Sequence, residues 1–153
     1  RSTSMPLTFF FSGDTGATDR ITALGADGFS VGSSSVVNVS GRTYYYVAWK
    51  VVGGKMKVGS YNGNGADNRT IAGVGFQPGY VIIRPDATAT NKNSIHKPAS
   101  SGVSTDTTLD FIASANDANE IQALQADGFQ VGSHGQVNQS GKEYYWMAFI
   151  DNP

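Results

Sequence analysis

Two stretches of six residues stand out in the hydrophobic pattern because neither has a polar side. Residues 44–49 read YYYVAW, and residues 144–149, 100 positions later, read YYWMAF. Successive side chains of a β-strand point to opposite faces, so both faces of such a strand would be apolar. Strands of this kind are typical of sheets that are covered on both sides. The pattern therefore predicts one buried strand in each half of the chain.

Shorter apolar segments alternate with tight turns through the rest of the chain. Within residues 21–31, Asp27-Gly28 separates two apolar segments, and an Asp-Gly pair in this setting is a strong hairpin signal. Residues 121–131 contain the same hairpin pattern. We also expect strands at residues 7–11, 56–61, 69–72 and 80–84, with residues 62–68 as a hairpin loop that joins the second and third of these.

One pattern occurs twice in the chain. Residues 21–49 align with residues 121–149 without a gap, and 17 of the 29 paired residues are identical. We call these ranges the first copy and the second copy. Three apolar or neutral residues of the first copy become polar in the second: Val36, Val39 and Thr43 are replaced by Gln136, Gln139 and Glu143. The two copies are therefore predicted to have different neighbours, with a polar surface on the second.

The repeat is predicted to be incomplete, at about one and a half copies of a unit of roughly 100 residues. Residues 56–85 supply a front half to the second copy, and no such segment precedes the first. The expected organisation is a back half of a first unit at 1–52, a connector at 53–55 and a complete second unit at 56–153. A sheet without its front strands has open edges. Three explanations stay open: a longer parent chain was cut, the front strands of the second unit serve both halves, or another subunit completes the first.

Composition favours an all-β fold and narrows the partners. The chain has 19 Gly and 11% aromatic residues among many Ser, Thr and Asn, which predicts short strands and tight turns in an antiparallel, jelly-roll-like β-sandwich. The net charge of −1 and the lack of like-charge runs predict no nucleic-acid partner. No apolar run approaches the roughly 20 residues of a membrane span, so no membrane insertion is expected. The absence of cysteine excludes disulfides, thiolate zinc sites and cysteine nucleophiles.

Several of these segments carry a resemblance. Residues 59–71 (GSYNGNGADNRTI), 73–81 (GVGFQPGYV), 124–132 (LQADGFQVG) and 137–141 (VNQSG) resemble a repeat of phage tail-associated proteins and large secreted bacterial surface proteins. The resemblance extends over essentially the whole chain. It implies a β-sandwich and an extracellular, cell-surface or virion setting. The family has no assigned catalytic residues, so the resemblance implies no active site.

The ionisable residues do not form a recognisable catalytic motif. Asp27 and Asp127 occupy equivalent turns, where an aspartate commonly bonds its own backbone. Neither of the two glutamates, Glu120 and Glu143, has an apolar sequence setting that predicts a raised pKa. The two histidines are expected in surface loops, and without cysteine they make a weak zinc site. We therefore predict no catalytic residues and no enzyme.

No cofactor is expected, although two groups of oxygen-bearing side chains could bind calcium. They are Asn62, Asn64 and Asp67 in one loop, and Asn116, Asp117 and Glu120 in another. A tight loop with positive φ angles explains the first group equally well.

The equivalent aromatic residues Tyr46 and Trp146 are candidates for stacking on sugar rings. Burial in a core is the competing interpretation for both.

Together these features predict a non-enzymatic structural or assembly module of an extracellular or virion fibre or surface appendage. Its expected partners are other copies of itself or neighbouring subunits of the fibre. The alternative is a glycan-binding recognition module, such as an adhesin or receptor-binding domain. A hydrolase is the least favoured interpretation.

Overall fold

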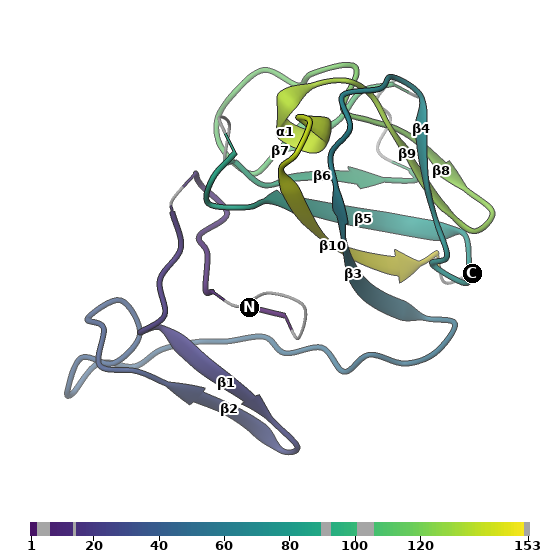
Figure 1. Ribbon diagram of the computed structural model, residues 1–153. Coiled ribbons are helices and arrows are strands. Elements are labelled where there is room, and N and C mark those ends of the chain that lie inside the picture. The colour runs from purple at the N-terminus through teal and green to yellow at the C-terminus, as the bar shows by residue number, and fades with distance from the viewer. Residues whose placement is uncertain (3–6, 14, 90–92, 101–105, 152–153) are drawn as a thin grey trace.

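The protein is mostly β-structure, as the sequence predicts. The computed structural model describes residues 1–2, 7–13, 15–89, 93–100 and 106–151. These residues form antiparallel sheets of five, three and two strands and one short helix, α1 (Gly135–Asn138). Among the described residues there is no helix long and apolar enough to cross a membrane. Most of the strands gather in one body, and the two-stranded sheet lies apart from it (Figure 1).

The five-stranded sheet is built around its second strand. Its order is β3 (Met56–Asn62), β10 (Glu143–Ile150), β5 (Pro78–Pro85), β6 (Ile95–Pro98) and β7 (Leu109–Asp110). Tyr145 of β10 lies opposite Ser60 of β3 on one side and Arg84 of β5 on the other. This arrangement confirms that residues 144–149 form an interior strand.

The three-stranded sheet contains β4 (Arg69–Ala72), β9 (Gly128–Val131) and β8 (Ile121–Gln125), in that order. β3 and β4 therefore lie in different sheets, and the expectation that residues 62–68 close a hairpin is wrong. The loop crosses between the sheets because the buried Asn138 side chain holds it. The Asn138 amide oxygen accepts from Asn64 N at 3.0 Å, and its Nδ2 donates to Ala66 O at 2.7 Å.

Side chains from both of these sheets share one hydrophobic core. Phe129 of β9 meets Trp146 of β10 edge-on, with ring centroids 5.7 Å apart. Tyr61 of β3 stacks on Tyr144 at 5.3 Å. The fully buried aliphatic residues of this core are Val81, Ile83, Ile95, Ile121, Val131 and Val137. The second unit is therefore stabilised across its two sheets.

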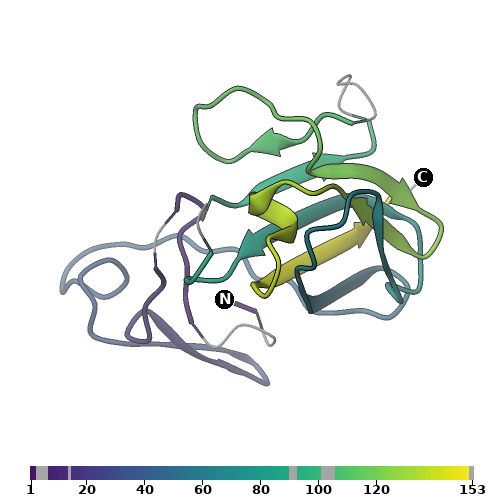
Figure 2. The same ribbon diagram turned by 45° about the horizontal axis from the view of Figure 1, so that its top comes forward.

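The first copy contributes only one small sheet, β1 (Ile21–Gly25) with β2 (Gly28–Val31), which projects from the body (Figures 1 and 2). The predicted Asp-Gly hairpin is confirmed here and at β8–β9. The strands predicted at residues 7–11 and 44–49 are absent, because residues 7–11 form only an isolated bridge from Thr8 to Ala17 and residues 44–49 pair with no described strand. A strand exists only where a neighbour accepts its backbone hydrogen bonds. Within the described part of the chain, no neighbour of that kind lies beside residues 44–49.

Replacing Asn138 tests the crossing loop. Asn138→Ala removes the buried amide that bonds Asn64 and Ala66, so we expect the free energy of unfolding to fall by about 2 kcal/mol. Asn38→Ala is the matched control, because Asn38 is the exposed equivalent and donates to Gly32 O at 2.9 Å. We expect the control to change stability by about 0.5 kcal/mol or less. Urea unfolding measures both, and equal losses would contradict the assigned role.

Candidate functional site

The hairpins of the two copies have the same geometry. In the first, Leu24 lies opposite Phe29, and the register shifts between Ile21 and Ala23. In the second, Leu124 lies opposite Phe129, with the register shift at the equivalent place. The local fold of the hairpin is therefore the same with and without a surrounding core.

A threonine fixes the start of each hairpin in the same way. Ile21 N donates to Thr8 Oγ1 at 3.1 Å, and Thr8 Oγ1 donates to Ile21 O at 2.9 Å. Thr108 makes the same two bonds to Ile121, at 2.9 and 3.2 Å. The correspondence between the halves thus begins before the aligned copies.

A tyrosine hydroxyl fixes the turn before each aromatic stretch. Tyr44 Oη accepts from Val39 N at 3.0 Å and donates to Ser35 O at 3.2 Å. Tyr144 Oη accepts from Gln139 N at 2.8 Å and donates to Gly135 O at 2.6 Å. Residues 44–49 are therefore anchored at their start like β10, although they lack its neighbours.

The two copies differ sharply in what covers them. β4 pairs along β9, whereas among the described residues β2 pairs with β1 alone. Val31 of β2 is 40% exposed, and its equivalent Val131 is fully buried. The outer edge of β2 therefore offers backbone groups for another strand.

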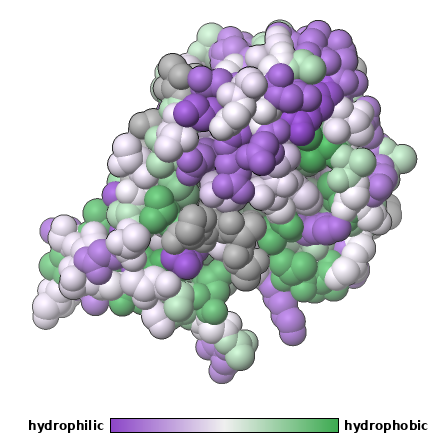
Figure 3. Space-filling model, viewed as in Figure 1, coloured by the Kyte–Doolittle hydropathy of each residue, from purple (hydrophilic) through white to green (hydrophobic). Residues whose placement is uncertain are grey.

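Residues 44–49 show the same contrast more strongly. Tyr45 is 95% exposed and its equivalent Tyr145 is 3% exposed. Trp49 meets the body through the edge of Phe149, with ring centroids 5.7 Å apart. We call β2 together with residues 44–49 the open interface. Hydrophobic surface is visible along the extension that carries it, while much of the top of the body is hydrophilic (Figure 3).

The Asp127 carboxylate connects its hairpin turn to the loop after β4. It accepts from Gly73 N at 3.2 Å and from Gly75 N at 2.5 Å, in the loop after β4. The sequence predicted that this aspartate bonds the backbone of its own turn. In the structure its carboxylate instead joins two elements of the fold. In the sequence, the Gly73-Val74-Gly75 pattern was the feature that could have indicated this contact. Asp27 presents the equivalent carboxylate at an exposed turn.

The proposed sugar-stacking residues do not form one site. Trp146 lies in the core, and Tyr46 is 75% exposed with its ring 4.9 Å from that of Phe29, edge to face. Two cavities, of about 90 and 270 Å³, lie near Arg1. Both are smaller than the roughly 300 Å³ at which ligand pockets begin. Glycan binding stays a prediction, and of the two rings only Tyr46 is placed to support it.

The first calcium candidate loop uses its oxygens internally. Asn64 Oδ1 accepts from Ala66 N at 3.0 Å. The Asp67 carboxylate accepts from Asn68 N at 2.8 Å and from the Gln122 amide at 2.9 Å. Asn62 ends β3. Asn68 has a φ of 57°, which fits the tight-loop interpretation.

The second calcium candidate group is spread across different environments. Asn116 and Asp117 are exposed, and Asp117 bridges the backbone of Thr108. Glu120 is buried. Among the residues that the structure describes, no three His, Asp or Glu side chains are grouped to hold a metal ion. Calcium binding at either group stays a prediction.

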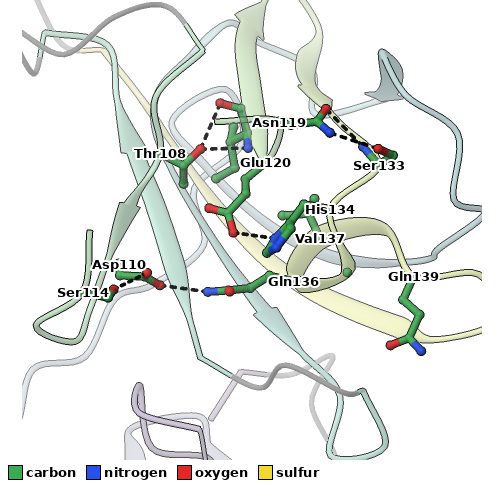
Figure 4. Close-up of polar contacts among 12 residues, drawn as sticks. Thr108, Asp110, Ser114, Asn119, Glu120, Ser133, His134, Gln136, Val137 and Gln139 are labelled. Carbon is green, nitrogen blue, oxygen red and sulfur yellow. Dashed lines mark hydrogen bonds and ion pairs between the residues drawn. The ribbon is translucent and has the colours of Figure 1, made fainter. Parts of the chain in front are cut away.

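The buried Glu120 and the partly exposed His134 form a polar contact that the sequence did not predict. Glu120 Oε1 lies 2.8 Å from His134 Nδ1 beside α1 (Figure 4). Burial raises the pKa of Glu120 to about 8, and the charges of Asp110 and Asp117 add to this rise. The expectation that neither glutamate has a raised pKa is therefore wrong for Glu120, since the fold buries it and the sequence setting does not show that burial.

Because burial favours the protonated form of Glu120, its carboxyl can donate to His134 Nδ1 across this contact. Neither of the two cavities borders it. A comparison of positions 100 residues apart could have indicated this pair, since Glu120 and His134 stand where the first half of the chain has Arg20 and Ser34. Two ionisable residues thus appear together in the copy that has a core.

His96 and Gln136 are also more enclosed than the sequence suggested. His96 was expected in a surface loop but lies in β6, against Phe111 at 4.5 Å, and burial lowers the pKa of His96. Gln136 was assigned to a polar surface but is buried, and its amide donates to Asp110 Oδ1 at 2.8 Å (Figure 4). The polar replacement of Val36 therefore serves the interior of the second unit.

The raised pKa of Glu120 predicts a pH-dependent stability. A folded-state pKa of about 8 means that the folded protein binds the Glu120 proton more tightly than the unfolded chain does. This contribution is complete below the unfolded pKa of roughly 4.3 and is lost as the pH rises through about 8. Glu120→Gln should remove that part of the decline, measured as melting temperature between pH 5 and 9. Glu143→Gln is the control and should keep the decline, so an unchanged slope in Glu120→Gln contradicts the assignment.

Comparison with known proteins gives a family. No curated protein and no solved structure matches the chain. A family described as a domain of unknown function, DUF7483, matches residues 22–153. This range spans the open interface as well as the second unit, and it covers most of the chain. The protein therefore belongs to the DUF7483 family of domains of unknown function.

Proposed function

We propose that the chain is a non-enzymatic structural module, in which β-sandwich units of about 100 residues pack in series within an extracellular or virion fibre or surface appendage. The observation that carries this proposal is the open interface: among the described residues, β2 pairs with β1 alone and the anchored residues 44–49 pair with no strand. An edge of this kind, with backbone groups and apolar side chains exposed together, is suited to pairing with another chain.

Two features support the serial units. The core shared between the five-stranded and three-stranded sheets favours a jelly-roll-like sandwich for the second unit. The matching registers and hydrogen bonds of the two copies favour a repeated unit, of which the first is only half present. The extracellular or virion setting rests on the sequence resemblance alone.

The distribution of exposed apolar residues supports assembly. Of the thirteen large hydrophobic residues that are well exposed in the described part of the chain, twelve lie before residue 53. Covering apolar surface contributes roughly 25 cal/mol per Å², so hiding this surface in an assembly is favourable. A large exposed apolar patch is typical of an interaction site.

The second candidate function is glycan recognition, which the exposed ring of Tyr46 favours. On this alternative, Tyr46→Ala abolishes retention on a glycan array with or without calcium, because it removes the stacking face. Tyr46→Phe is the control, since it keeps the stacking ring and removes only the hydroxyl. An array without any binder contradicts this alternative.

Self-association is the direct test of the assembly function. We expect light scattering after size exclusion to show species larger than the monomer that increase with concentration. Tyr45→Glu combined with Val47→Glu should reduce them at least tenfold without lowering the melting temperature, because both side chains are exposed.

The matched control places two glutamates on the second unit, at the exposed positions Ala113 and Ala118. This variant should associate like the unmodified chain. A protein that stays strictly monomeric at high concentration contradicts self-association.

A further inference from the structure

We propose that the open interface is completed by a polypeptide segment from outside residues 1–153 that has the residue pattern of residues 56–85, which we call the front segment. This inference rests on the assembly function proposed above and names its partner. A β4-like strand would pair with the outer edge of β2, and β3-like and β5-like strands would lie on either side of residues 44–49. The second unit provides the template for each of these contacts.

The first contact is the edge of β2. In the second unit, β4 approaches Gly128 so closely that a Cβ there would lie 2.0 Å from Ile71 O. Gly28 of β2 has nearly the same φ, 141° against 147° at Gly128. Beside Gly28, the described residues leave the surrounding 4 Å open. The first copy therefore has the backbone shape and the space that a β4-like strand needs.

The second contact is the aromatic stretch. Tyr61 of the front segment stacks on Tyr144 and donates from its hydroxyl to Val137 O at 2.7 Å. The first copy has Tyr44 and Val37 at the equivalent positions, and the Tyr44 hydroxyl already makes the same two bonds as that of Tyr144. A tyrosine from a second front segment would thus meet a ring and a carbonyl that are already in place.

The third contact is the turn carboxylate. Asp127 binds two glycine N–H groups of the front segment, at Gly73 and Gly75. Asp27 holds the equivalent carboxylate in an exposed turn of the same hairpin geometry. A Gly-x-Gly loop entering beside β2 would therefore find its acceptor. All three contacts fit the same partner, a front segment. They are the edge of β2, the aromatic stretch and the turn carboxylate.

The pairing of the one front segment within residues 1–153 shows why the partner lies outside these residues. The chain contains one front segment and two back halves. β4 of the front segment pairs with β9, and β3 and β5 both pair with β10. Another copy of this chain could donate its front segment only by exposing the core of its own second unit. The explanation that one front segment serves both halves is therefore not the arrangement in this structure.

A fusion tests the proposal in the full chain. Residues 54–100 are placed before Arg1, which keeps the spacing of 100 residues between equivalent positions. We expect amide hydrogen exchange at residues 45–49 to slow by about 100-fold or more, toward that of residues 145–149. The control fusion carries Ile71→Asp and Ile83→Asp in the added segment only, which removes its core-facing side chains, and it should leave the exchange fast. Fast exchange in the unmodified fusion overturns the proposal.

A measurement in trans covers a fusion that does not fold. A peptide of residues 56–85 is titrated into the unmodified chain, and Trp49 emission is followed in the Trp146→Phe variant. We expect one peptide per chain, a shift to shorter wavelength, and binding weakened about tenfold or more by Asp27→Ala. No shift at any peptide concentration overturns the proposal.

Light scattering of the unfused chain separates the two ideas. If the unfused chain associates but residues 45–49 of the fusion still exchange fast, the front-segment partner is overturned and the assembly function stands. A monomeric chain that nevertheless binds the peptide supports the partner and contradicts self-association.

Discussion

The structure depends on the two-sided pairing of β10. A strand with apolar residues on both faces is stable only when sheet neighbours take its backbone groups and core residues cover its faces. β3 and β5 supply those neighbours, and the three-stranded sheet supplies the cover. Residues 44–49 share three of their six residues with residues 144–149 and have similar side chains at the others, but the described residues give them neither sheet neighbours nor a covering core. The contrast isolates the contribution of tertiary contacts, since composition and local anchoring are almost equal in the two stretches.

The second copy has changed in ways that suit a closed core. Gln136 reaches Asp110 where the first copy has Val36, and Glu120 contacts His134 where the first has Arg20 and Ser34. Buried polar groups of this kind are stabilising only when they are paired. They are found in the unit whose strands are all present, whereas the first copy keeps apolar residues at its surface.

The sequence was sufficient for features set by neighbouring residues and insufficient for those set at a distance. The Asp-Gly hairpins were predicted correctly because the turn itself selects them. The crossing of residues 62–68 was missed because its cause, Asn138, lies some 70 positions away. The burial of Glu120 was missed because the polar residues just before it in the sequence do not indicate it. Residues 44–49 were wrongly predicted as a strand, because the local pattern does not show whether a partner strand lies beside them.

The position of the open interface also gives the molecule a direction. It belongs to the first half of the chain alone, and the second unit presents a different surface. A contact between two unlike surfaces is heterologous, so it cannot close into a two-fold symmetric dimer and instead generates a ring or an open filament. An open filament in which each such interface receives a front segment carried by the next subunit would therefore have two distinguishable ends and would grow with a defined polarity.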